Sequence, residues 1–253
     1  MSYLPGKFVW FEHASSDVAK ARPFYEPLFG WHVENMPLGE TPYPMIMNAG
    51  GGIGGFSSAQ GAGARWVSYV SVPDVDKAYA AALAAGATSE SPPVDWGPVG
   101  RGAAIVDPTG ARISLWKSAQ DDQPDVDDTP AGGWVWNELT TSDPKAALAF
   151  YTKVVGYSQD AMDMGPQGTY YLLKTSGDRG RAGVMKAMDP KMPSQWIPYV
   201  HSGDCDATLA KAKQLGATIC VPATDIPGIG RFGMMVDPLG ALIATIKTLP
   251  RST

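Results

Sequence analysis

The chain has 253 residues, of which 44% are hydrophobic, and this supplies apolar material for two cores of ordinary domain size. Five aspartates within residues 119–130 account for the whole formal net charge of −5, so neither half carries a basic excess for nucleic acid or an anionic membrane. The sequence has no apolar run near the roughly 20 residues of a membrane span, no signal-peptide pattern at its start, and two cysteines without zinc-type spacing. We therefore expect a cytoplasmic protein without nucleic-acid or membrane partners.

The first half predicts two successive units that each begin with a strand and a helix. Residues 8–14 alternate like a strand, and Ser16 or Asp17 can cap a helix that ends near residue 29. Short strand patterns follow at 31–36, 43–48 and 53–57. The second unit has a strand at 66–72, an alanine-rich helix at 74–85, and closing strands at 103–107 and 111–117.

The second half repeats these motifs. Phe24-Tyr25 returns as Phe150-Tyr151, and the turn Asp-Pro-Thr-Gly at 107–110 returns as Asp-Pro-Leu-Gly at 237–240. Self-similarity at one nearly fixed offset indicates tandem copies of one unit. We expect an α+β protein with two tandem domains, each of two βαβββ units. The domains are predicted at residues 1–118 and 132–253, joined by an acidic, solvated Pro/Gly linker at 119–131.

The order of these motifs resembles a known superfamily. A helix ending in Phe-Tyr-x4-Gly-aromatic, then Ala-Gly-Ala-Thr, then Asp-Pro-x-Gly and a last strand, is similar to the vicinal oxygen chelate superfamily. That superfamily includes glyoxalase I, extradiol dioxygenases, and fosfomycin- and bleomycin-resistance proteins. Residues 136–143 and 225–232 resemble its two-domain, antigen-like branch most closely. The resemblance implies that each domain is an incomplete β-barrel around a cavity, with helices on the convex face.

The resemblance also implies where a divalent metal would be held. Enzymes of this superfamily place His, Gln or Glu on the first strand of each unit and on the last strand of each domain. The corresponding positions here hold Trp10, Val67, Ser114, Trp136, Ile197 and Ala244. Among these only Ser114 offers a donor, and a weak one, whereas such an ion needs three or four converging N or O donors. We therefore expect no metal cofactor.

Strand alternation predicts which side chains face the two cavities, if the metal positions point inward. We interpret eight residues as ligand-binding: Trp10, Glu12, Tyr69, Arg112, Ser114, Trp116, Trp136 and Tyr199. An aromatic wall with a few polar groups is typical of a small-molecule pocket. It is equally typical of a filled core, in which Trp10 and Trp136 would occupy the space that a metal takes in relatives.

Two carboxylates, Glu12 and Glu138, are the polar feature most in need of a partner, because an unpaired carboxylate inside a barrel is unfavourable. One hypothesis makes Glu138 and His201 a catalytic acid/base pair in the second cavity. In the first cavity Ser71 replaces the histidine, and Arg112 is a candidate to neutralise Glu12. The alternative is structural: each glutamate accepts a hydrogen bond from a tyrosine hydroxyl or a backbone N–H.

Two functions of different classes follow. The first is a glyoxalase- or bleomycin-resistance-like protein that binds a small aromatic or polar-anionic molecule in its barrel cavities without a metal. The alternative is a glyoxalase-like lyase or isomerase that uses Glu138 and His201 for proton transfer. A dioxygenase is disfavoured because ring cleavage needs iron that this donor set does not hold. Whether the protein is an enzyme, and whether it is a monomer or a homodimer, the sequence leaves open.

Overall fold

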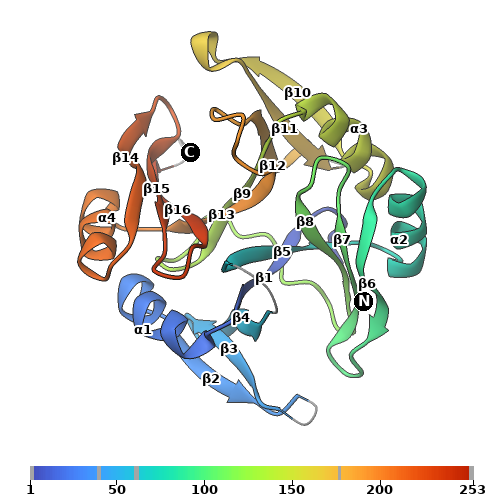
Figure 1. The fold of residues 1–253 in the computed structure, drawn as a ribbon, viewed down its shortest axis with the longest axis horizontal. Helices are drawn as coiled ribbons and strands as arrows, with labels where there is room; N and C mark the ends of the chain where they lie inside the picture. The colour runs from blue at the N-terminus through green and yellow to red at the C-terminus, as the bar shows by residue number, and fades with distance from the viewer. Residues whose placement is uncertain (1–2, 39–40, 60–62, 176–177, 251–253) are drawn as a thin grey trace. The chain divides into compact units, whose positions relative to one another are not determined.

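The computed structural model describes residues 3–38, 41–59, 63–175 and 178–250. Within these residues the chain forms four α-helices and sixteen β-strands, which are arranged in two mixed eight-stranded sheets (Figure 1). None of the described helices is long and apolar enough to cross a membrane.

The first half of the chain supplies one sheet, with strand order β2-β3-β4-β1-β5-β8-β7-β6. Its elements are β1 (Phe8–Ser15), α1 (Val18–Phe29), β2 (His32–Met36), β3 (Tyr43–Asn48), β4 (Gly51–Ser58), β5 (Arg65–Ser71), α2 (Val75–Ala84), β6 (Thr88–Asp95), β7 (Gly100–Val106) and β8 (Arg112–Ser118).

The second half supplies the other sheet in the same order, β10-β11-β12-β9-β13-β16-β15-β14. Its elements are β9 (Trp134–Thr141), α3 (Pro144–Val155), β10 (Ser158–Asp163), a short 3₁₀ turn (Gly165–Gln167), β11 (Thr169–Thr175), β12 (Arg179–Lys186), β13 (Gln195–His201), α4 (Cys205–Gln214), β14 (Thr218–Ile226), β15 (Gly230–Val236) and β16 (Leu242–Thr248). Four βαβββ units in sequence confirm the predicted α+β tandem fold. Neither sheet closes into a barrel.

Local sequence explains where the helices begin. In each unit an aspartate precedes the helix and accepts a hydrogen bond from a backbone N–H of the first turn: Asp17, Asp74, Asp143 and Asp204. Gly30 and Gly156 end α1 and α3 in the left-handed conformation, with φ of 72° and 85°. The capped helices therefore begin and end where the sequence predicts.

Strand β6 was not predicted, because Pro92 and Pro93 fall within it and proline cannot donate to a ladder. The strand is accommodated because it lies at the edge of its sheet. Its pairing with β7 also shifts register twice, between Ser89 and Ser91 and between Ser91 and Val94. An edge position and two irregularities let a proline-containing segment remain a strand.

Contacts divide the chain into two compact units that interleave the two halves of the sequence. The first unit contains Met1–Trp10, Val67–Asp125 and Trp136–Trp196, and the second contains Phe11–Trp66, Val126–Val135 and Ile197–Thr253. Helix α2 packs beside α3 in the first unit, and α1 packs beside α4 in the second. The boundaries 1–118, 119–131 and 132–253 remain a prediction about the sequence repeat.

Inside each unit, the repeated sequence motifs hydrogen-bond to the motifs of the other half. In the second unit Trp66 donates to the hydroxyl of Tyr25 (2.9 Å), which donates to Asp237 (2.9 Å). In the first unit Trp196 donates to Tyr151 (2.8 Å), which donates to Asp107 (2.8 Å). The tyrosine of each Phe-Tyr motif thus binds the aspartate of the other half's Asp-Pro-x-Gly turn.

The sequence predicts a solvated acidic linker, but the linker is only partly solvated. Asp122 is buried and accepts hydrogen bonds from the Leu4 backbone N–H (2.7 Å) and the Ser71 hydroxyl (2.6 Å). Asp125 forms ion pairs with Lys7 (3.4 Å) and Arg181 (2.7 Å). The prediction is wrong for these two aspartates, because basic and hydroxyl groups distant in the sequence lie beside them in the first unit.

Candidate functional site

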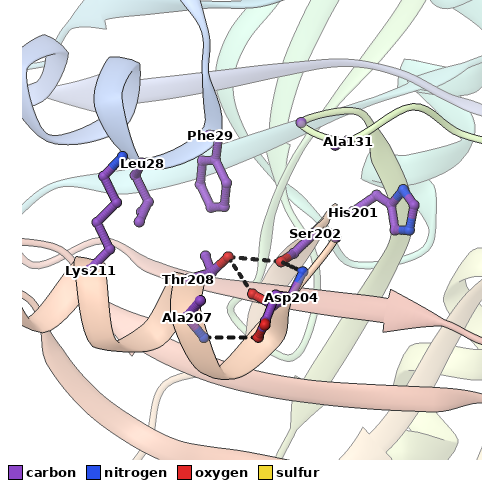
Figure 2. A pocket seen from close by; sticks show the side chains of 11 residues that line it. Leu28, Phe29, Ala131, His201, Ser202, Asp204, Ala207, Thr208 and Lys211 are labelled. Atoms are coloured by element: carbon purple, nitrogen blue, oxygen red, sulfur yellow. Dashed lines mark hydrogen bonds between the residues drawn. The ribbon is translucent and has the colours of Figure 1, made fainter.

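A pocket of about 210 Å³ lies between the end of α1 and the start of α4 in the second unit, and His201 is part of its lining (Figure 2). Its polar groups are largely bonded to one another. The Thr208 hydroxyl is 2.7 Å from that of Ser202 and donates to the Asp204 carbonyl oxygen (2.8 Å), and Lys211 donates to the Pro27 carbonyl oxygen. This internal pairing leaves little in the pocket to orient a ligand.

A more distinctive surface lies on strands β5, β8, β7 and β6 of the first unit. Tyr69 and Trp116 are half-buried, and their rings meet edge to face with centroids 5.9 Å apart. Ser114, which pairs directly with Tyr69, is buried beside them. Directly paired residues project to the same face, so this sheet face carries two aromatic rings and a hydroxyl. We refer to it as the aromatic face.

Two glycines of β7 determine how Trp116 lies on this face. Gly102 pairs with Trp116 across the β7–β8 ladder, and a Cβ added at Gly102 would lie 2.7 Å from the indole. A Cβ at Gly100 would lie 2.6 Å from the indole as well. The indole therefore lies flat on backbone, which only glycine permits at these two positions. The role of these two glycines was not predicted, although a glycine within a strand pattern is a sign that another group approaches the backbone closely.

At the other end of the aromatic face, Arg112 donates to Glu90 (2.5 Å) with both side chains partly exposed. The Glu12 carboxylate accepts a hydrogen bond from Tyr43 (3.0 Å). The hypothesis that Arg112 neutralises Glu12 is therefore replaced by a different partner for each residue. Because Glu90 already neutralises the Arg112 guanidinium, the aromatic face suits a neutral ligand better than an anionic one.

The equivalent face of the second unit is filled with apolar side chains. Tyr199 is buried and stacks on Phe232 with centroids 6.3 Å apart. Ile246 stands where the first half has Trp116, and Ala244 where it has Ser114. All three of Tyr199, Ala244 and Ile246 are buried. The two halves thus diverged: one face is aromatic, partly polar and half-exposed, and the other is close to an ordinary core.

Each glutamate is paired with a tyrosine from the strand next to β4 or β12. Tyr43 donates to Glu12, and a Cβ at Gly55, which pairs with Glu12, would overlap the Tyr43 hydroxyl. Tyr170 occupies the same place over Gly183, which pairs with Glu138. This repeated arrangement matches the structural alternative in which each glutamate accepts a hydrogen bond from a tyrosine hydroxyl. Tyr43 and Tyr170 were not predicted as the donors.

The second of these pairs is the more deeply buried. Trp136 donates to the Tyr170 hydroxyl (2.9 Å), and that hydroxyl in turn donates to Glu138, which is 6% exposed. Burial, followed by the negative charge of Glu138, raises the pKa of Tyr170 well above its ordinary value. Tyr170 therefore stays protonated and acts as a donor.

Glu138 and His201 were expected to share a cavity, and this pairing remains a prediction. Glu138 belongs to the first compact unit and His201 to the second. The partner that the structure gives Glu138 is Tyr170. His201 pairs with Ile246 in the β13–β16 ladder, and its Nδ1 atom is buried without a hydrogen-bond partner among the described residues.

The donors available at the superfamily's metal positions do not fit a divalent ion. Trp10, Val67, Trp136, Ile197 and Ala244 carry no suitable donor. On the neighbouring strands β4 and β12, tyrosine hydroxyls lie over Gly55 and Gly183. Among the residues that the structure describes, no group of three or more His, Cys, Asp or Glu side chains is placed to hold a metal. The expectation of no metal cofactor remains a prediction that metal analysis of the protein must decide.

Paired βαβββ units, whose strands β1 and β5 are neighbours at the centre of an eight-stranded sheet, define a tandem vicinal oxygen chelate fold. A family model described as Glyoxalase/Bleomycin resistance protein/Dioxygenase superfamily matches residues 7–115. The chain is 34% identical over 257 residues to "Putative glyoxylase CFP32" of Mycobacterium tuberculosis (strain CDC 1551 / Oshkosh), covering 98% of this chain and 97% of that one. The protein belongs to the glyoxalase/bleomycin resistance protein/dioxygenase superfamily.

More distant similarities agree with this family. The chain is 28% identical over 270 residues to the anthracycline biosynthesis protein DnrV of Streptomyces peucetius, covering 97% of this chain and 94% of that protein. Among solved structures, the Mn(II)-bound glyoxalase from Novosphingobium aromaticivorans has a TM-score of 0.66 at 17% identity, over 96% of this chain and 82% of that one. The latter likeness establishes the fold alone.

Proposed function

We propose that this protein binds a small, neutral aromatic molecule on the aromatic face of its first half, without using a metal. The observation that carries the proposal is the half-exposed pair Tyr69 and Trp116, with the Trp116 indole laid on Gly100 and Gly102. Aromatic rings held rigidly beside a hydroxyl provide stacking surface at low entropic cost. Ser114 supplies that hydroxyl, and it is the polar group that would orient the ligand.

The difference between the two halves supports this choice of site. The second half fills the equivalent positions with Ile246 and Ala244, which removes both the aromatic platform and the hydroxyl. The relative named for anthracycline biosynthesis suggests a ligand class, because an anthracycline is a planar polycyclic aromatic compound. The uncharged, sugar-free aglycone of an anthracycline, which is the anthracycline probe used below, and simpler phenols are therefore suitable first probes.

The test is calorimetric titration of the full chain with an anthracycline and with a single-ring phenol. Trp116→Leu is expected to weaken binding at least tenfold, because it removes the largest contact surface. Phe232→Leu, at the filled face of the second half, is the matched control and is expected to leave affinity unchanged. Equal affinities in wild type and Trp116→Leu, with unchanged melting temperatures, would refute the proposal.

A second candidate is a lyase or isomerase in which Glu138 moves a proton, with His201 as its partner. It is favoured by the buried Glu138–Tyr170–Trp136 chain of hydrogen bonds and by the glyoxylase name of the relative. Thr140, two residues along β9 on the same side as Glu138, has a buried hydroxyl without a partner among the described residues. A base and a hydroxyl on one face of β9, with a phenolic donor from β11, form a group suited to proton transfer.

Turnover of a hemithioacetal by the full chain tests this candidate. Glu138→Gln is expected to abolish the activity and His201→Asn to reduce it, while Glu12→Gln, at the repeated position of the first half, serves as the control. Equal rates in wild type and Glu138→Gln would exclude Glu138 as the base.

A further inference from the structure

A second tryptophan, Trp96, directly follows β6 in the turn that joins β6 to β7, two strands labelled in Figure 1. The backbone N–H of Trp96 donates to the Gly100 carbonyl oxygen (2.8 Å), which extends the ladder in which Val94 pairs with Gly102. Directly paired residues of antiparallel strands project to the same side of a sheet. Trp96 therefore projects to the side that carries Trp116.

The bare glycines bring Trp116 close to this hairpin. The atom of Trp116 nearest to a Cβ at Gly100 is Cζ2, so the six-membered ring of the indole lies over Gly100. Trp96 begins directly across the ladder from Gly100, and neighbouring strands are roughly 5 Å apart. Trp116, which lies over β7, and Trp96, which follows β6, are therefore neighbours on one face of the sheet.

Trp96 is exposed, and the hairpin backbone around it is held by hydrogen bonds. It is 49% exposed, and the described residues include no ring that contacts it. The hairpin tip is fixed by hydrogen bonds from the Gly97 N–H to Asp95 (2.7 Å) and from the Ala119 N–H to the Val99 carbonyl oxygen (3.1 Å). An exposed tryptophan on a preorganised hairpin is the kind of residue that contributes most to a binding site.

We propose that the Trp116 indole is the floor, and Trp96 one wall, of a slot for a planar, fused-ring aromatic ligand. This inference rests on the proposed function and adds the ligand's shape to it. A single ring can be held where Tyr69 on β5 meets Trp116. Trp96 follows β6, three strands from β5, so a fused-ring system is needed to contact both Tyr69 and Trp96. The charged residue nearest to Trp96 and Trp116 on β7, Arg101, does not lie on the aromatic face. It projects to the opposite face of the sheet and pairs there with Asp76 (2.8 Å). The ligand is therefore neutral along this edge.

The experiment compares Trp96→Ala with two controls in calorimetric titrations of the full chain. One control is Ile226→Ala, at the repeated position of the second half, and the other is Val99→Ala, at the same hairpin tip. The probes are an anthracycline and a single-ring phenol. We expect Trp96→Ala to weaken anthracycline binding roughly 3- to 10-fold, as loss of one aromatic contact implies, and to leave phenol binding unchanged. Both controls should bind as wild type does.

Because Trp96 is half-exposed, Trp96→Ala should keep the wild-type melting temperature, which shows that any loss is local. If Trp116→Leu loses both ligands while Trp96→Ala binds the anthracycline as tightly as wild type, the slot is refuted and the proposed function stands. If wild type binds neither probe, both proposals fail together. An equal loss for phenol and anthracycline in Trp96→Ala would also contradict the slot, since the phenol should not reach Trp96.

Discussion

At the scale of single residues, the two halves use the same buried carboxylate with different neighbours. Asp237 accepts hydrogen bonds from Tyr25 and is 2.8 Å from His13 Nε2, and His13 is fully buried. Asp107 has the equivalent tyrosine, but the position equivalent to His13 is the buried Leu139. The first unit therefore shows what the second would be without its histidine.

His13→Leu should lower the free energy of unfolding by about 1–3 kcal/mol at pH 7, because it removes a hydrogen bond to a buried charge. Burial alone would raise the pKa of Asp237, but the hydrogen bond from His13 and that ring's charge help to hold it below its ordinary 3.8. Folding thus favours the ionised form. This contribution is complete above about pH 3.8 and is lost as pH falls through the lower folded pKa.

Urea unfolding between pH 3 and pH 7 checks this prediction. The gap between wild type and His13→Leu should narrow below about pH 3.8, where Asp237 is increasingly protonated. His32→Leu, at an exposed histidine, is the control and should change stability by less than about 0.5 kcal/mol. A gap that stays constant to pH 3 would show that His13 does not act through Asp237.

At the scale of elements, the first part of the linker, residues 119–125, behaves as part of the first unit. Asp122 joins it to the chain's beginning through Leu4 and to β5 through Ser71. Asp125 gathers three basic residues around one carboxylate: Lys7, Arg179 and Arg181. Removing these contacts should loosen the N-terminal residues as well as the linker.

Asp122→Ala should destabilise the protein by about 1–3 kcal/mol, since it leaves the Leu4 N–H and the Ser71 hydroxyl without their acceptor. Thermal unfolding measures the loss, and limited proteolysis should show faster cleavage near the linker. Asp128→Ala, at an exposed aspartate of the same segment, should be neutral. Equal stability of the two variants would mean that the linker is held by its ion pairs alone.

At the scale of the whole molecule, the sequence repeat and the compact units are different divisions of one chain. Each unit takes one βαβββ unit from each half, and its Tyr–Asp hydrogen bond joins the two. A chain cut in the linker would therefore retain every one of these contacts. We therefore predict that the covalent connection between the halves is dispensable for the fold once it has formed.

A protease site inserted between Val126 and Asp127 tests this. After cleavage, the two fragments should stay together and elute from a sizing column at the position of the intact chain, separating only in denaturant. Tyr25→Phe combined with Tyr151→Phe should weaken the association of the cleaved fragments, because both hydrogen bonds between motifs are lost. Fragments that separate in native buffer would contradict the prediction.

Local chemistry allowed most of the fold to be predicted, and distant pairing explains what was missed. The aspartate caps are local, so the helices were placed closely, and the motif repeat indicated the tandem units. Strand β6 was missed because its prolines are tolerated only at a sheet edge, which is a property of the assembled sheet. Likewise, one hydrogen-bond donor to Asp122, the Leu4 N–H, is 118 residues away, and no local sequence pattern indicates this contact.

The candidate site divides in the same way. Alternation along a strand placed Tyr69, Ser114 and Trp116 on one face, because side-chain direction follows from the backbone alone. The tyrosines that bind Glu12 and Glu138 come from other strands, and no sequence spacing links each tyrosine to its glutamate. Glu138 and His201 belong to different compact units, and strand alternation does not determine whether residues of different units come together.

The 224 residues that separate His13 from Asp237 also bear on how the protein is synthesised. The second compact unit is complete only when strands β13 to β16 have left the ribosome, so the helix and sheet of residues 11–66 must wait until residues 197–248 have been synthesised. Contacts of such long sequence separation form slowly, and apolar surface stays uncovered meanwhile. The N-terminal segment should therefore depend on chaperones during synthesis, whereas the first unit, whose parts end at residue 196, can close earlier.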